Sequence, residues 1–358
     1  MVQFMQWFWR EEFWLSPGIM WEDLQETEDI RYPQPHHLLF CFPIALLLVA
    51  LRFIFERKIA IPLSKKLSLQ EKVRREPSPN QILEAFYAKW RKGPQKEEIR
   101  GLAKQCDLQS RQVERWFRYR MNQNQPSMTK KFCEACWRAV YMLIFSFVGW
   151  AILYDKPWFW NVNECLDGYP QPAQLSLLGF YLMQFSMTWS SVLTMPFDIK
   201  QKDFHIMIVH HVVTILLVGF SYCVNHIRIG SVVMFLHDVS DWPLFATKVF
   251  IYLKWQKTRN TLFVIFALGF LFARGIVFPY KFLYNTYNYV VEFQQPYFGC
   301  YVFMILLLVL YLLNVFWCCL IILMIYRFLI HSKLKKDVRS DSEGSEEEDV
   351  DEEDQKAE

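Results

Sequence analysis

The chain has 358 residues, of which 53% are hydrophobic, 18% aromatic and 21% charged. A soluble protein of this size usually carries about 25% charged residues and a smaller hydrophobic share. The composition excludes a disordered chain, a collagen and a secreted disulfide scaffold. The mean hydropathy of +0.08 and the net charge of +3 are averages, because long apolar stretches alternate with strongly charged ones.

Seven stretches come close to the roughly 20 apolar residues that a helix needs to cross a bilayer core. The sequence therefore predicts an all-α, polytopic membrane protein with about seven transmembrane helices. The first 35 residues carry many acidic side chains and lack the apolar core of a cleavable signal peptide. The predicted spans are residues 38–55, 139–154, 175–195, 205–224, 229–253, 261–280 and 299–330.

Lysines and arginines are unevenly distributed around these spans, and this distribution predicts the orientation in the membrane. If the N-terminus lies outside the cytosol, the cytosolic segments hold 31 of the 39 basic residues and the outside segments hold five. The opposite orientation would reverse this bias. We therefore expect residues 1–37 to be luminal and the C-terminus to be cytosolic.

The cytosolic segment before the second span is basic and contains three predicted helices, ILEAFYAKW, EEIRGLAKQCDL and SRQVERWFRYRMNQ. A helix–turn–helix with Trp116 and Phe117 near its end resembles the second half of a homeodomain, which assigns residues 75–128 to a partial homeobox-like domain. Tyr119 stands where that family has the asparagine that reads adenine, and this difference argues against DNA binding. We favour a small helical domain whose basic face meets anionic lipid headgroups, with a phosphate-bearing substrate as the alternative.

Ionisable residues inside two predicted spans are the strongest functional signal, because charged groups are costly in a bilayer. His210 and His211 lie in the fourth span, while Asp238 and Asp241 share a helix face in the fifth. Antiparallel neighbouring helices would bring the two pairs to a similar depth. A neutral imidazole can accept a proton from a nucleophile or attack an acyl group, and a carboxylate can orient it. The cluster predicts acyl transfer between lipid-soluble substrates, with a single-metal site and purely structural burial as alternatives.

The sequence resembles the ceramide synthases, within the wider TLC-type membrane family, over nearly its whole length. The resemblance is carried by FDIKQKDFHIMIVHHVVTILLVGFSYCVNHIRIGSVVMFLHDVSDWPLFATKVF, WFWREEFWLSP, RQVERWFRYRMNQNQPS and YDKPWFW. It implies N-acylation of a sphingoid base (sphinganine or sphingosine) at the endoplasmic reticulum membrane. Fatty acyl-CoA would be the co-substrate, with no metal or other cofactor. The paired histidines and both aspartates of HDVSD fall on the family's essential positions.

Two chemical routes remain open for this reaction. One histidine either acts as general base for direct attack by the amine, or is acylated first and then transfers the acyl group. We favour the second route, because a narrow membrane site could hold the two long chains in turn. A non-catalytic TLC-type lipid sensor or translocation accessory is the alternative function, and it would not need the His/Asp cluster. The resemblance also allows a homodimer or a heterodimer with related synthases.

The resemblance further implies that the short loop before the last span helps to set the acyl-chain length. An ordinary interfacial loop is the alternative, because aromatic residues gather at membrane edges. The loop comprises Tyr287, Asn288, Tyr289, Val290, Val291, Glu292, Phe293, Gln294, Gln295, Pro296, Tyr297 and Phe298.

The C-terminal end of the chain, RSDSEGSEEEDVDEEDQKAE, is acidic and almost free of apolar residues, which predicts a disordered tail over residues 333–358. Ser340 and Ser345 each precede an acidic residue by three positions. We expect an acidophilic kinase to phosphorylate both, and then Ser342 once Ser345 carries a phosphate. The predicted TLC-type catalytic domain covers residues 131–332.

Overall fold

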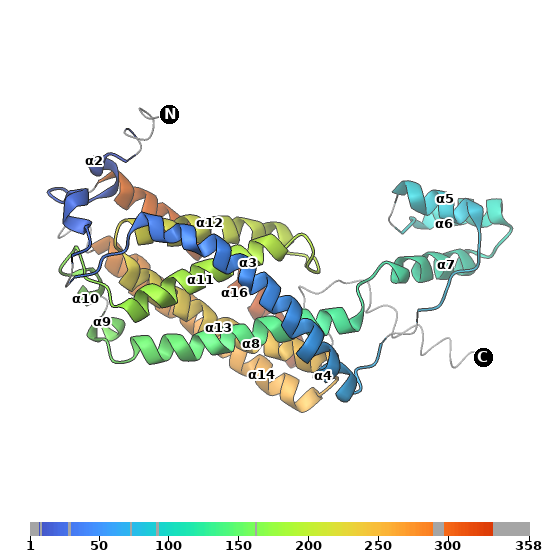
Figure 1. Cartoon of the computed structure of the whole chain (residues 1–358). Helices are drawn as coiled ribbons and strands as arrows, with labels where there is room; N and C mark the ends of the chain where they lie inside the picture. The colour runs from blue at the N-terminus through green and yellow to red at the C-terminus, as the bar shows by residue number, and fades with distance from the viewer. Residues whose placement is uncertain are drawn as a thin grey trace.

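The computed structural model is helical in all the elements that it describes (Figure 1). The described residues are 7, 9–27, 30–71, 74–90, 93–161, 163–288 and 297–331. The elements are α2 (Glu11–Trp14), η1 (Trp21–Leu24), η2 (Pro35–Phe40), α3 (Cys41–Phe55), η3 (Glu56–Ala60), α4 (Ile61–Lys66), α5 (Gln81–Trp90), α6 (Lys96–Cys106), α7 (Ser110–Gln123), α8 (Met128–Leu153), α9 (Pro157–Trp160), α10 (Asn163–Leu166), α11 (Leu175–Thr194), α12 (Phe204–Cys223), α13 (Ile227–Tyr252), α14 (Gln256–Phe270), η4 (Leu271–Tyr284) and α16 (Phe298–His331).

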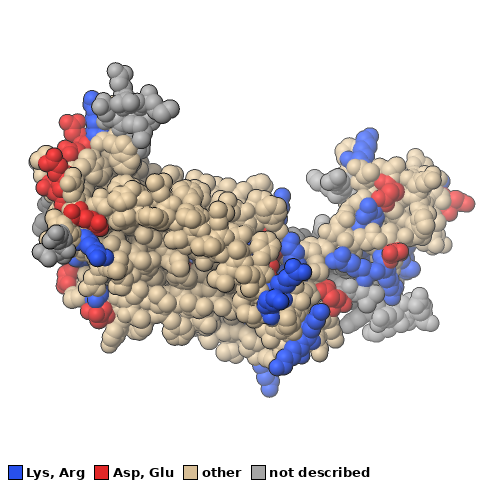
Figure 2. Space-filling view, in the orientation of Figure 1, with Lys and Arg blue, Asp and Glu red and all other residues tan. Residues whose placement is uncertain are grey.

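Five helical stretches among the described residues are long and apolar enough to cross a membrane. They confirm that the chain is a multi-pass membrane protein with an all-α fold. Figure 2 shows a broad uncharged band between two charged ends of the helical body, as a bilayer requires. The five stretches are Pro35–Lys66, Met128–Leu153, Phe204–Cys223, Gln256–Asn288 and Phe298–Ile330.

The third and fifth expected spans form helices α11 and α13, which are not among these five stretches. Helix α13 has 26 residues, and at 1.5 Å per residue it is about 39 Å long, enough for a bilayer core. It packs against α8 and α14, and α11 packs against α3 and α12. Asp238 and Lys248 of α13 are buried among these neighbours. The polar side chains that interrupt the apolar pattern therefore face other helices.

The second membrane helix begins earlier than residue 139, where its apolar stretch starts. Helix α8 begins at Met128, and the hydroxyl of Ser127 caps it by accepting a hydrogen bond from Lys130 N at 3.1 Å. Its first three turns carry Glu134 and Arg138, which contact the loop after α11. Because these charged side chains contact another part of the protein, the helix can extend over residues that a search for a continuous apolar stretch leaves out.

Helices α5, α6 and α7 form a separate unit with its own apolar core, which includes Trp116 and Phe117. Trp116 Nε1 donates to Ser78 O at 2.6 Å, and Arg120 binds the Glu84 carboxylate at 2.7 Å. The hydrogen bond from Arg120 holds the pKa of Glu84 below its usual value. In Figure 1 this unit stands beyond one end of the membrane body, while α2 and η1 lie at the opposite end.

Two of the apolar clusters among the described membrane helices lie next to the candidate site. The larger one links α11, α12, α13 and α16 through side chains that include Tyr181, Leu217 and Phe303. The smaller one links α13, α14 and α16, and it includes Phe270 and Trp317. Residues of both clusters border a single cavity, so the packing of the bundle also builds the walls of the candidate site.

Candidate active site

A cavity of about 230 Å³ lies between α8, α11, α12, α13, the α14–η4 stretch and α16. Its lining residues on α12 extend from Phe204 to Ser221, a distance of about 25 Å along the helix axis. The cavity therefore runs along most of α12, and the residues that line it differ between its two ends.

One end of the cavity is charged and polar and the other is apolar. Asp198, Gln201 and Asp203, from the loop between α11 and α12, line the polar end. Leu217 and Phe303 are among the residues that line the opposite part, and Phe303 stacks on Phe220, whose ring contacts Trp14 of α2. Such a cavity fits an amphipathic ligand with one long apolar chain.

All four predicted catalytic residues line this cavity. His210 and His211 come from α12, and Asp238 and Asp241 come from α13. His237 also lines the cavity, and its ring centroid lies 6.5 Å from that of His210. Two neighbouring helices thus bring three imidazoles and two carboxylates to one wall.

His210 is held by its surroundings but keeps one ring nitrogen without a partner. Its ring meets the Trp317 ring edge-on, with 5.2 Å between centroids, and Thr214 donates a hydrogen bond to its backbone carbonyl at 2.8 Å. The buried Nδ1 atom has no hydrogen-bond partner among the residues that the structure describes. A buried ring nitrogen without a hydrogen-bond partner can bind a polar atom of a substrate or accept a proton from it.

The two carboxylates bind different polar side chains. Asp238 is buried and accepts a hydrogen bond from the amide of Gln184 on α11. Asp241 forms an ion pair with Arg274 at 2.6 Å. Among the described residues the structure has no hydrogen bond between either carboxylate and a histidine ring. The carboxylate of Asp241 is thus paired with a cation, and that of Asp238 with a neutral amide.

Arg274 is a site residue that the sequence pattern did not single out. Its side chain is 3% exposed, and besides Asp241 it donates to Ser240 Oγ at 3.0 Å and to the His237 carbonyl at 3.2 Å. It also reaches Asn314 Oδ1 on α16 at 3.4 Å. The signal that could have identified it is an arginine within an apolar stretch, which is rare unless the residue is paired or functional.

Metal binding finds no support in the described part of the chain. No group of three or more His, Cys, Asp or Glu side chains there has an arrangement that could hold a metal ion.

The loop expected to influence acyl-chain length is described only at its two ends. Tyr287, Asn288, Tyr297 and Phe298 are described, and residues 289–296 lie outside the described residues. None of these four side chains lines the cavity. The predicted phosphorylation sites in the acidic tail also lie outside the described residues, so both expectations stay predictions.

Comparison with known families agrees with this architecture. Residues 131–323 match the TLC domain family, and residues 70–124 match the homeodomain family. The TLC match covers every residue that lines the cavity. The fold and the site thus define a polytopic TLC-domain membrane protein that carries a homeodomain.

Similar proteins narrow this class further. The chain is 44% identical to ceramide synthase 3 of Homo sapiens over 342 residues, which cover 95% of this chain and 88% of that protein. It is 42% identical to ceramide synthase 4 of Mus musculus over 339 residues (94% and 86%). It is 41% identical to ceramide synthase 5 of Homo sapiens over 347 residues (96% and 88%). The chain belongs to the ceramide synthase family.

Proposed function

We propose that this protein is a ceramide synthase that transfers a fatty acyl group from acyl-CoA to the amine of a sphingoid base. Both substrates carry one long apolar chain and one polar end. The observation that carries the proposal is one long cavity that combines an apolar part, a charged end and the histidines and carboxylates between them. A protein that only senses or translocates lipid would not require that combination.

We propose that His210 or His211 acts as a nucleophile in the first half of the reaction. A neutral imidazole nitrogen attacks the thioester carbonyl carbon, a C–N bond forms and the C–S bond breaks. The CoA thiolate leaves and takes up the proton that the imidazole loses. The acyl chain then remains bound in the cavity while CoA departs from its charged end.

In the second half of the reaction, the uncharged amine of the sphingoid base attacks the same carbonyl carbon. The bond to the imidazole nitrogen breaks, an amide forms, and the amine proton returns to the imidazole. Asp238 and Asp241 stabilise positive charge that develops on the imidazole and the amine. Sequential occupation suits a single cavity, because the two long chains need not be held side by side before the acyl group has transferred.

Alanine variants of the paired histidines test the proposed function. We expect purified His210→Ala and His211→Ala to lose ceramide formation from sphinganine and acyl-CoA, measured by mass spectrometry of the product. His205→Ala is the matched control, because His205 lies on the same helix but is exposed and does not line the cavity. Full activity in both cavity variants would show that the histidines are not catalytic.

A single-turnover experiment separates the two chemical routes. Wild-type protein mixed with acyl-CoA and no sphingoid base should gain the mass of one acyl group, and peptide mapping should find that group on His210 or His211. An unmodified protein that still forms ceramide in multiple turnovers would exclude the covalent route and favour general-base catalysis.

We further propose that the protein resides in the endoplasmic reticulum membrane with its N-terminus luminal and its C-terminus cytosolic. The excess of basic residues in the segments assigned to the cytosol supports this orientation. In the same orientation the charged end of the cavity meets the cytosol, where Arg138 and Lys248 could receive the anionic CoA moiety.

A further inference from the structure

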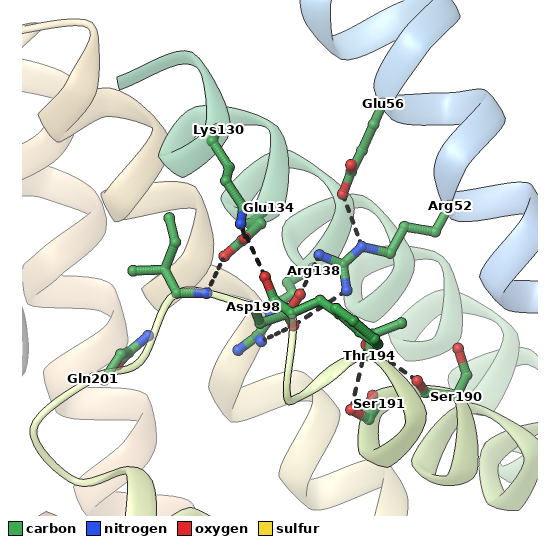
Figure 3. Close-up of polar contacts among 12 residues, drawn as sticks. Arg52, Glu56, Lys130, Glu134, Arg138, Ser190, Ser191, Thr194, Asp198 and Gln201 are labelled. Carbon is green, nitrogen blue, oxygen red and sulfur yellow. Dashed lines mark hydrogen bonds and ion pairs between the residues drawn. The ribbon is translucent and has the colours of Figure 1, made fainter. Parts of the chain in front are cut away.

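The loop between α11 and α12 is fixed at three consecutive residues on the charged end of the cavity (Figure 3). Lys130 Nζ donates to the Phe197 carbonyl at 2.9 Å, and Ile199 N donates to Glu134 Oε2 at 3.3 Å. Both contacts come from α8. The residue between them, Asp198, is bound by α8 and also by α3, the first membrane helix.

Asp198 lies between two arginines, and we call these three side chains the Asp198 cluster. Arg52 of α3 binds the carboxylate in a fork, with Nη2 to Oδ1 at 2.7 Å and Nη1 to Oδ2 at 3.2 Å. Arg138 of α8 binds Oδ2 at 2.8 Å. The side chains of Arg52 and Asp198 are only 10% and 8% exposed. A buried bidentate pair of this kind is geometrically specific, and an ammonium group cannot reproduce it.

The three members of the Asp198 cluster differ in their relation to the cavity. Asp198 and Arg138 line it, whereas Arg52 does not. Arg138 also lies over the Phe245 ring at 5.5 Å, as does Lys248. Arg138 therefore divides its charge between Asp198 and the cavity. How strongly Asp198 attracts Arg138 depends on whether a second cation already neutralises the carboxylate.

We propose that Arg52 is a positioning residue for acyl-CoA binding, acting through Asp198. By neutralising and fixing Asp198, Arg52 holds the loop against α8 and leaves Arg138 directed at the mouth of the cavity for an anionic group. Without Arg52, Asp198 binds Arg138 alone and draws its charge away from the cavity. Helix α3 precedes residues 131–323, the part that matches the TLC family, so the first membrane helix contributes to the site from outside that domain.

This proposal rests on the proposed function, because the anionic ligand is the CoA part of the acyl donor. We expect Arg52→Ala to raise the KM for acyl-CoA about tenfold while kcat changes less than about twofold. Arg52→Lys keeps the positive charge but loses the bidentate contact with Asp198. Its KM for acyl-CoA should therefore lie between those of the wild type and Arg52→Ala. The KM for the sphingoid base should stay at the wild-type value in both variants.

Arg57→Ala is the matched control. Arg57 lies five residues further along the same helical stretch, is exposed and does not line the cavity. Its removal takes away the same charge from the same end of the bundle. An equal rise in the KM for acyl-CoA in Arg57→Ala would show a general effect of surface charge and would overturn the proposal.

Amide hydrogen exchange of the full-length protein supplies a readout that does not depend on activity. Peptides covering residues 195–203 should exchange faster in Arg52→Ala and Arg52→Lys than in wild type or Arg57→Ala, because the loop loses a fixed contact. An exchange rate equal to that of the wild type in both Arg52 variants would overturn the proposal. Faster exchange with an unchanged KM for acyl-CoA would overturn it as well. If wild-type protein formed no ceramide, the proposed function would fail, and exchange alone would decide whether Arg52 fixes the loop.

Discussion

Arg274 of η4 links the candidate site to two other helices, α13 and α16. It binds Asp241 and the His237 carbonyl on α13, and it reaches Asn314 on α16. A carboxylate buried in a membrane protein is strongly destabilising unless a cation and hydrogen bonds compensate for its lost hydration. Arg274 therefore accounts for how Asp241 can be accommodated beside the histidines.

Replacing Arg274 tests this role. We expect Arg274→Gln to lower the thermal stability of the purified protein and to reduce ceramide formation at least tenfold, because the partly buried carboxylate of Asp241 loses the cation that compensates for its lost hydration. Arg259→Gln is the control, since it removes the same charge from α14 at a position outside the cavity. Wild-type turnover in Arg274→Gln would contradict the assignment of Arg274 to the site.

The histidines and aspartates could be predicted from the sequence, whereas most of their partners could not. An ionisable side chain in an apolar stretch is conspicuous, and spacing within a helix shows which of these residues share a face. Gln184 carries no such signal, because glutamine is common in many environments. Its contact with Asp238 depends on which side of α11 faces α13. This relative orientation cannot be predicted from the sequence of either helix.

At the level of elements, close approach between helices depends on a few small residues. A Cβ atom added at Gly149 of α8 would lie 2.7 Å from Phe235 Cδ2 on α13 and 3.2 Å from Phe180 Cζ on α11. Helix α13 carries Asp238 and Asp241, so the position of α8 against α13 also determines how one wall of the cavity is placed.

We therefore expect Gly149→Ala to destabilise the bundle. Inserting a methyl group into a tightly packed contact costs about 1–3 kcal/mol, and the unfolding temperature in detergent should fall by several degrees. Gly179→Ala is the matched control, because a Cβ there meets nothing within 4 Å and alanine favours the helix. Equal unfolding temperatures for the two variants would refute the importance of this contact.

Element boundaries were predicted less well than the elements themselves. Helix α8 extends eleven residues before the expected start, and the first helical stretch continues to Lys66. The additional turns of α8 carry Glu134 and Arg138, which contact the loop after α11, whereas those of the first stretch carry Glu56, which pairs with Arg52 one turn earlier in the same stretch. A search for apolar stretches finds the part of a helix that faces lipid. It misses helical turns whose charged side chains are paired with other parts of the protein.

At the scale of the whole molecule, the chain forms a membrane body and a three-helix unit with separate apolar cores. The sequence predicted the three helices, and the homeodomain match over residues 70–124 supports the resemblance. Tyr119 accepts a hydrogen bond from Arg75 at 3.4 Å. The position that reads adenine in DNA-binding relatives thus holds a side chain that interacts within the unit.

The opposite positions of the N-terminal segment and the three-helix unit lead to a test of orientation. In microsomes from expressing cells, an epitope tag at the N-terminus should resist added protease, while a tag at the C-terminus should be removed. Detergent should make both tags accessible, which controls for protease activity. Digestion of the N-terminal tag in intact microsomes would reverse the proposed orientation.

The sequence by itself determined the class of protein, the helical fold and the paired histidines and aspartates of the candidate site. These properties follow from local pattern, namely runs of apolar residues and the few charges that interrupt them. Tertiary structure alone decided how those charges are paired. Arg52 and Asp198 are 146 positions apart and Trp317 and Asp203 are 114 apart. Such contacts depend on which helices lie side by side and how each is rotated, because periodicity within one helix specifies a face but not the residue that the face will meet.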